Sequence, residues 1–154
     1  MAFKTTIELE KEFEVSWKQE KVFELLSNVP KSVAHFPKVD ELVDLGDNSY
    51  RWEMEKIGIQ AYHIQTIYAC TYHADKENMK VTWEPVDGVG NGVVSGSWEL
   101  EETEKGTLVR FYTKGTLEID LPFFVKMVVS PVVSMEFESM VDTYHENLQE
   151  TMNQ

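Results

Sequence analysis

The most constraining feature of the sequence is its C-terminal segment, in which large apolar side chains recur at intervals of three and four residues. The recurring positions are Val133, Phe137, Met140, Val141, Tyr144 and Leu148. This spacing places them on one face of an α-helix, and acidic residues occupy the remaining faces. A helix with a long apolar stripe must bury it against another layer of structure, which the rest of the chain has to supply.

Upstream of this helix, apolar and polar side chains alternate in several short segments, which is the pattern of half-buried β-strands. The predicted strands cover residues 7–15, 39–45, 50–55, 59–72, 80–84, 94–101 and 109–119. Short turns join most of them, so we expect an antiparallel sheet of about six to seven strands. The expected fold class is α+β, with a curved antiparallel sheet wrapped around the long C-terminal helix.

Two short helices are expected after the first strand. Ser16 and Gln19 match the S-x-x-Q capping box that begins many helices, and Pro30 marks the end of the first helix. Residues 31–36 are expected to form the second. Later in the chain, Pro131 is compatible with a first helical turn but would kink a helix interior. Residues 121–130 are therefore expected to form a separate helical turn or a kinked entry to the long helix.

Length and charge limit the classes of function. The 154 residues predict one domain spanning residues 1–154. A formal net charge of −13 disfavours nucleic acid and anionic membrane surfaces as partners. The longest apolar stretch, residues 121–133, is shorter than the about 20 residues of a bilayer span. With one cysteine and no apolar signal core at its start, the chain is predicted to be cytoplasmic, without a transmembrane segment.

The strand faces that point toward the long helix are rich in aromatic side chains, which indicates a cavity. Buried Tyr and Trp need partners for their O–H and N–H groups, and a cavity that holds water or a ligand supplies them more readily than a dry core. A plain packed core is the alternative. The predicted ligand-binding residues are Tyr50, Trp52, Met54, Tyr62, Ile64, Thr66, Tyr68, Trp83, Trp98, Phe111, Thr113, Phe137, Met140, Val141 and Tyr144.

Two lysines and the single cysteine also fall on inward faces. Lys11 and Lys56 could each pair with a ligand carboxylate at a cavity mouth, or extend the ammonium group into water. Cys70 is expected to act as a small buried hydrophobe. The glycine-rich residues 87–92 are expected to form a mobile loop over the cavity mouth.

The four histidines do not have the spacing of metal ligands. They are His35, His63, His73 and His145, and His63 and His73 fall on the outer face of the predicted sheet. No nucleotide-binding or nucleophile-elbow motif is present. The sequence therefore predicts no catalytic residue, no metal site and no cofactor.

Residues 121–130 are apolar on all sides, which exceeds what one buried face requires. One interpretation is a helix start wedged into the core. The other is a gate that makes transient contact with a membrane or a partner protein while a ligand is exchanged. The sequence does not distinguish a monomer from a homodimer.

Several segments resemble the START-like, or SRPBCC, superfamily. They are residues 15–30, Pro37 before Val39, the acidic hairpin formed by residues 98–103 and 107–111, and the long terminal helix. The superfamily includes polyketide cyclase/dehydrase-like proteins, Bet v 1-like proteins and a group associated with carbon-monoxide dehydrogenase. The resemblance implies a helix-grip fold with a cavity between sheet and helix, in a superfamily that binds lipids, sterols, polyketides, plant hormones or quinones. It transfers no catalytic residue.

The function predicted first is non-catalytic binding or transport of a hydrophobic small molecule that is lipid-, polyketide- or quinone-like. The first alternative is a polyketide cyclase/dehydratase-like or hydrolase-like enzyme that polarises a carbonyl with Tyr or Lys groups of the pocket. The second alternative is a protein-interaction or complex-assembly module. That alternative predicts a filled core and a functional surface around residues 121–130.

Overall fold

The computed structural model describes residues 2–154 and contains a seven-stranded antiparallel sheet in the order β1-β9-β8-β7-β6-β3-β2. The strands are β1 (Phe3–Val15), β2 (Val39–Gly46), β3 (Ser49–Met54), β6 (Ile67–Asp75), β7 (Lys80–Pro85), β8 (Gly92–Glu102) and β9 (Thr107–Ile119). The longest ladder pairs β1 with β9, from Phe3 opposite Ile119 to Val15 opposite Thr107. Consecutive antiparallel strands and short turns confirm the predicted sheet.

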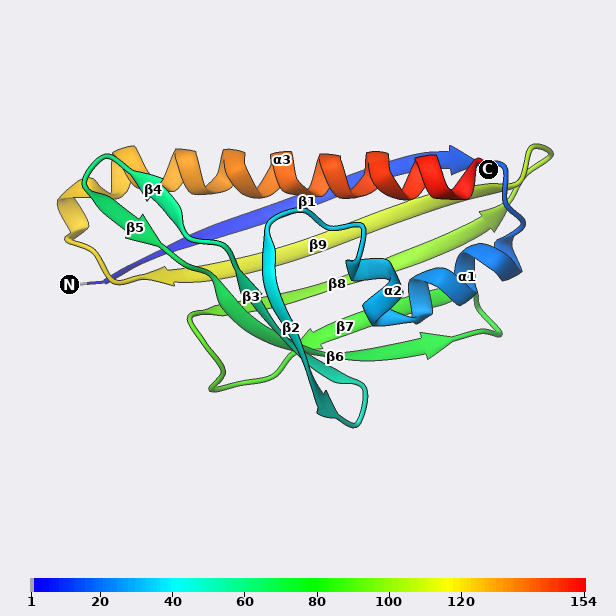
Figure 1. Ribbon diagram of the computed structural model, residues 1–154, viewed down its shortest axis with the longest axis horizontal. Helices are drawn as coiled ribbons and strands as arrows, with labels where there is room; N and C mark the ends of the chain where they lie inside the picture. Colours follow the sequence, from blue (N-terminus) through cyan, green and yellow to red (C-terminus); the bar gives the residue numbers. More distant parts are fainter. Residues whose placement is uncertain (1) are drawn as a thin grey trace.

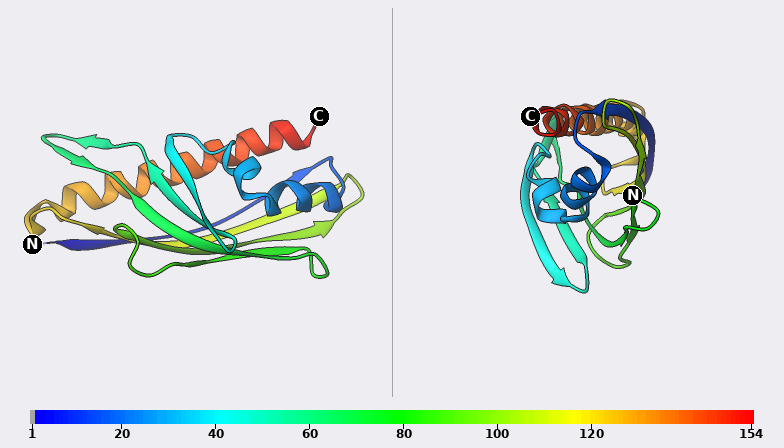
Figure 2. Two further views of the ribbon diagram at one scale, coloured as in Figure 1. Left: turned by 60° about the horizontal axis from the view of Figure 1, so that its bottom comes forward. Right: turned by 90° about the vertical axis from the view of Figure 1, so that its right-hand side faces the viewer.

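One helix, α3 (Lys126–Met152), runs along the concave side of this sheet (Figure 1). Its 27 residues make it about 40 Å long. The predicted apolar stripe is buried except for Phe137, which is half-buried, and Val133, Val141 and Leu148 are each at most 5% exposed. Figure 2 shows the sheet curving around the space that α3 and the two short helices fill. The α+β arrangement with a curved sheet around a long C-terminal helix is confirmed.

The start of α3 combines features of both predicted alternatives. A short 3₁₀ turn, η1 (Phe123–Val125), precedes the helix, as expected for a separate turn. The helix then begins at Lys126 and continues past Pro131, which lies in its second turn. Residues 126–130 therefore already belong to the long helix.

The two short helices are α1 (Gln19–Ser27) and α2 (Val29–Val33), and the predicted capping box is wrong. Lys18 is the N-cap of α1, with no side-chain hydrogen bond. Ser16 instead binds the end of α3: its amide donates to Asn153 Oδ1 at 2.8 Å, and its hydroxyl donates to the Met152 carbonyl at 3.3 Å. The helix C-terminus leaves carbonyl groups unsatisfied, and Ser16 satisfies one of them.

The second short helix begins and ends earlier than predicted. Asn28 caps α2 by accepting a hydrogen bond from the Lys31 amide at 3.2 Å. Pro30 therefore lies in the first turn of α2, where its missing N–H costs nothing, rather than closing α1.

The predicted continuous strand 59–72 is also wrong, because a separate hairpin interrupts it. Strands β4 (Ile57–Ile59) and β5 (Tyr62–Ile64) pair with each other and not with the main sheet. Gln60 has a φ of 56°, in the left-handed region, and turns the chain between them. Strand β6 begins only at Ile67. The hairpin directs Ile59 and Ile64 into a second apolar cluster with Val129 and Val133 of α3.

The glycine-rich residues 87–92 are bonded to the neighbouring strands through Asn91. Its Oδ1 accepts from the Ile67 amide at 2.9 Å, and its Nδ2 donates to the Gln65 carbonyl at 2.8 Å. Its backbone amide donates to the Ile67 carbonyl, and its carbonyl accepts from the Glu118 amide. Four hydrogen bonds thus join Asn91, at the end of this loop, to Gln65, to the start of β6 and to β9.

We predict that Asn91→Ala lowers the free energy of unfolding by about 1–3 kcal/mol, because it leaves partly buried backbone groups of Gln65 and Ile67 without partners. Urea unfolding followed by circular dichroism measures this change. Asn78→Ala is the matched control, because Asn78 bonds only Asp75 at an exposed turn. Equal stability of the two variants would contradict the proposed role of Asn91.

Candidate ligand cavity

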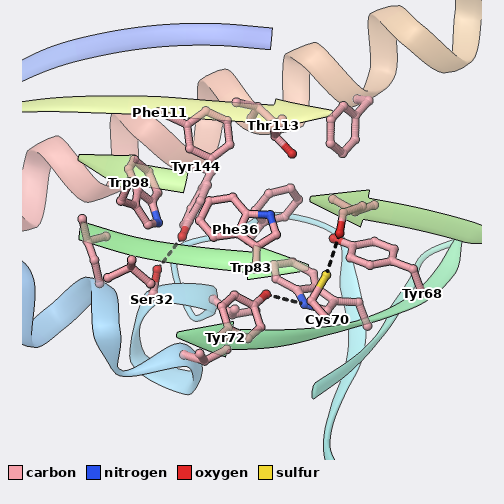
Figure 3. Close-up of a pocket in the computed structure, with 18 residues that line it drawn as sticks. Ser32, Phe36, Tyr68, Cys70, Tyr72, Trp83, Trp98, Phe111, Thr113 and Tyr144 are labelled. Atoms are coloured by element: carbon pink, nitrogen blue, oxygen red, sulfur yellow. Dashed lines mark hydrogen bonds between the residues drawn. The ribbon is translucent and has the colours of Figure 1, made fainter. Parts of the chain in front are cut away.

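A cavity of about 50 Å³ lies between α3, the two short helices and the concave face of the sheet. Its wall combines residues from eight elements and one loop (Figure 3). The lining residues are Leu26, Val29, Ser32, Val33, Phe36, Trp52, Tyr68, Cys70, Tyr72, Val81, Trp83, Val94, Trp98, Phe111, Thr113, Phe137, Val141 and Tyr144. An engineered cavity of about 150 Å³ admits benzene. A ring compound therefore enters this cavity only if some of these side chains move.

Aromatic rings form two groups along the wall. On the sheet, Trp98 lies 4.7 Å and Trp83 lies 5.9 Å from Phe111, measured between ring centroids. Elsewhere on the same sheet, Trp52 of β3 stacks on Tyr68 of β6 at 5.4 Å between ring centroids, with an angle of 18° between the planes. The geometry offers flat faces for another ring to stack against.

Two smaller features complete the aromatic wall. Phe36, in the turn after α2, contacts Trp52 at 5.3 Å and Tyr144 at 4.9 Å between centroids. Gly96 lets the Trp83 indole lie across β8, because a Cβ at this position would be 2.4 Å from Trp83 Cζ2. Any larger residue at position 96 would displace the indole from the cavity wall.

Hydroxyl groups supply the polarity of the cavity. Tyr144 and Ser32 share a short hydrogen bond that joins α3 to α2. The Tyr72 hydroxyl accepts from Trp52 Nε1 at 3.0 Å. Thr113 donates to the Ser95 carbonyl at 3.1 Å. Each of these hydroxyls can replace its present hydrogen-bond partner with an oxygen atom of a ligand. Because the groups are uncharged, the exchange leaves no unpaired charge in the interior.

The titratable groups of the cavity are neutral at neutral pH. Burial raises the pKa of the Cys70 thiol to about 12. Burial also raises the pKa of the hydroxyls of Tyr68, Tyr72 and Tyr144 above the ordinary value. No carboxylate, histidine, lysine or arginine is among the described residues that line the cavity. The cavity can therefore form hydrogen bonds and stacking contacts, but it contains no ion pair partner and no ready general base.

The structure brings most of the predicted site residues together. Those that line the cavity are Trp52, Tyr68, Trp83, Trp98, Phe111, Thr113, Phe137, Val141 and Tyr144. Thr66 and Met140 line a second cavity beside it. Tyr50 is half-buried in a shallow groove between α2 and β2. Met54 and Ile64 are buried without lining the first cavity, and Tyr62 is half-buried on the β4–β5 hairpin.

Sequence reasoning missed the side of the cavity that α1, α2 and the following turn form. Ser32 and Phe36 come from segments whose packing against α3 has no periodic pattern in the sequence. Tyr72, in contrast, shares the even parity of Tyr68 and Cys70 on β6, and that parity could have identified it.

The lysines predicted to face inward do not reach the cavity. Lys11 forms ion pairs with Glu138 at 2.5 Å and Asp142 at 3.4 Å, and so links β1 to α3. Lys56 is exposed between β3 and β4. Within residues 2–154, no group of three or more His, Cys, Asp or Glu side chains is arranged to hold a metal ion, and no helix has both the length and the apolar character needed to cross a bilayer.

His145 occupies an aromatic cluster behind the cavity wall. It is 5% exposed, and its ring lies 4.6 Å from Phe111, 5.2 Å from Phe13 and 5.5 Å from Trp98 between centroids. Its Nε2 atom has no hydrogen-bond partner among the described residues. Burial lowers the pKa of the imidazole to about 4, against a smaller opposing effect of Asp142. The folded protein thus holds this histidine uncharged.

We predict that His145 makes the protein less stable in acid. Between its pKa of about 4 in the folded state and about 6.5 in the unfolded chain, the unfolded chain binds a proton that the folded protein excludes. Stability therefore falls as the pH falls through this range. From pH 7.5 to pH 5, urea unfolding should show a loss about 2 kcal/mol larger in wild type than in His145→Phe. The same pH dependence in both proteins would contradict this assignment.

No protein-family model matches the chain, and no curated protein matches its sequence. Solved structures do match. A START superfamily protein from Mycobacterium smegmatis superposes with a TM-score of 0.64 and 11% identity over 94% of this chain and 96% of that chain. The Zhui aromatase/cyclase from a Streptomyces species has a TM-score of 0.56 and 12% identity over 97% and 92%. A major latex-like protein from Panax ginseng has a TM-score of 0.59 and 13% identity over 96% and 97%.

The chain has the START-like helix-grip fold. The shared arrangement extends over nearly the whole length of this chain and of these three structures. In this helix-grip protein, α3 is the gripped helix, and the cavity lies between α3 and the concave face of the sheet, closed on one side by α1 and α2.

Proposed function

We propose that this protein binds an uncharged hydrophobic small molecule in the cavity between sheet and α3, without catalysing a reaction on it. The observation that carries this proposal is the combination of aromatic walls, several hydroxyls and no charged lining side chain among the described residues. Aromatic surface supplies affinity through burial, and the hydroxyls orient the oxygen atoms of a ligand. The helix-grip fold, shared with an aromatase/cyclase and a major latex-like protein, is compatible with such a ligand.

The cyclase-like or hydrolase-like alternative has less support from the cavity. Acid–base catalysis at neutral pH needs a group whose pKa lies near 7. The pKa values of the cavity thiol and tyrosine hydroxyls are instead raised, and Lys11 is paired with Glu138 outside the cavity. Binding is therefore the better-supported function.

Two probes of similar shape test the proposal. We predict that 2-naphthol binds and that naphthalene-2-carboxylate binds at least about 100-fold more weakly, because an unpaired buried carboxylate costs several kcal/mol. Isothermal titration calorimetry at pH 7 measures both affinities. Val141→Phe, which fills the cavity from α3, should abolish 2-naphthol binding. The control Met135→Phe lies on the exposed side of the same helix and should bind as wild type does.

Two results would contradict the proposal. One is equal affinity for the neutral and the anionic probe. The other is 2-naphthol binding that survives in folded Val141→Phe. A native mass spectrum of protein purified from its own host would identify the natural occupant directly.

We also propose that residues 121–130 make transient contact with a membrane or another protein while the ligand is exchanged. Phe123, Phe124 and Met127 are 59%, 80% and 89% exposed, and Val128 is 49% exposed. Leu121, Val125 and Val129 pack inward against the second apolar cluster. The segment is therefore both anchored in the protein and apolar on its outer side, as interfacial helices are.

We predict that wild-type protein cosediments with phosphatidylcholine vesicles and that Phe124→Asp reduces this binding about tenfold, the effect of removing one buried aromatic side chain. Phosphatidylcholine is zwitterionic and carries no net charge, so these vesicles avoid repulsion by the protein's net charge of −13. Met135→Asp is the matched control, since Met135 is 66% exposed on α3 outside this segment. Unchanged sedimentation of folded Phe124→Asp would count against a membrane contact.

A further inference from the structure

A second cavity, of about 40 Å³, lies beside the first, and the two share a wall of side chains. Tyr68 from β6, Val94 from β8 and Phe137 from α3 line both. Tyr68 and Val94 are buried, whereas Phe137 is only half-buried. Phe137 is therefore the member of the wall with the most freedom to turn.

The two cavities differ in chemistry. The first presents aromatic rings and the hydroxyls of Ser32, Tyr72 and Tyr144. The second is mainly aliphatic on the side away from the shared wall, where Ile7, Ile57, Leu117, Val133 and Met140 are among the residues that line it. An aromatic compartment with hydroxyls suits a ring that carries oxygen, and an aliphatic compartment suits a hydrocarbon chain.

Each cavity alone is smaller than the about 150 Å³ that admits a benzene ring. Because Phe137 is half-buried, its ring can turn toward solvent, which adds the volume of the ring to the first cavity and opens that cavity to the second. A molecule with a ring at one end and a chain at the other would then contact matching surfaces in both compartments.

We propose that the two cavities form one bipartite site for an uncharged ring compound with an aliphatic chain, with the ring in the first cavity and the chain passing Phe137 into the second. This inference rests on the proposed binding function and specifies the ligand class and its orientation. The second cavity lies toward the β4–β5 hairpin and the start of α3, since Ile57 belongs to β4 and Val133 to the early part of α3 (Figure 1). The chain of the ligand thus points toward the end of the protein that carries Phe123 and Phe124.

The experiment measures the affinities of phenol, 4-butylphenol and 4-octylphenol by calorimetry. Each methylene buried in the second cavity should tighten binding about fourfold, which corresponds to about 0.8 kcal/mol. Val133→Phe narrows only the second cavity. In that variant, phenol should bind as in wild type, and the gain from the alkyl chain should disappear. Met135→Phe, on the exposed side of α3, should keep the gain.

Gly92→Ala provides a second variant if Val133→Phe does not fold. A Cβ at Gly92 would lie 3.5 Å from Tyr68 Cβ and 3.8 Å from Leu117 Cδ1, which are ordinary contacts, and it would occupy space in the second cavity. This variant should weaken 4-octylphenol at least about fourfold, the effect of one displaced methylene, and leave phenol unchanged.

The outcomes separate the two proposals. If neither phenol nor 2-naphthol binds the folded protein, the proposed function fails. If phenol binds but the alkyl chain adds no affinity, the bipartite site is overturned and the binding function stands. The bipartite site is also overturned if the gain from the chain is the same in wild type and in both second-cavity variants.

Discussion

The packing of α3 into the concave face of the sheet is the constraint on which the remaining structure depends. The apolar stripe of α3 holds the helix against the sheet. Ser16 bonds Met152 and Asn153 at the end of the helix, and Lys11 forms ion pairs with Glu138 and Asp142. With its axis and rotation fixed, Phe137, Val141 and Tyr144 must face the sheet. The backbone thus determines where the interior lies, and the side chains determine how much of it stays open.

Much of this arrangement was predictable, because strand parity and helix periodicity both follow from which side chains are buried. The apolar stripe of α3 and the alternation along β1, β8 and β9 needed no tertiary information. The β4–β5 hairpin could not be predicted without tertiary information. Tyr62 and Ile64 share the even parity of Tyr68 and Cys70, as if one unbroken strand contained all four. The break depends on the left-handed backbone of Gln60, a residue with no strong preference for that conformation.

The residues of the candidate site divide in the same way, into those that a sequence pattern specifies and those that depend on tertiary packing. Residues that project from regular strands or from α3, such as Trp83 and Tyr144, were predictable as inward-facing. Ser32 and Phe36 were not, because their positions depend on how a five-residue helix and the turn after it pack on α3. The volume of the cavity could not be predicted from the sequence either. It depends on the rotamers of rings such as Phe36 and Phe137, which no pattern of residue types specifies.

The attachment of the C-terminus to the start of the first helical segment has a practical consequence. Trp17 donates from its backbone amide to the Met152 carbonyl at 3.1 Å and from Nε1 to the Gln154 carbonyl at 3.3 Å. Gln154 is thereby held at the end of the molecule opposite η1 (Figure 1). A tether attached at Gln154 would immobilise the protein on a solid support with Phe123, Phe124 and Met127 facing the solution. All immobilised molecules would then present the same apolar end to a vesicle or protein added in solution.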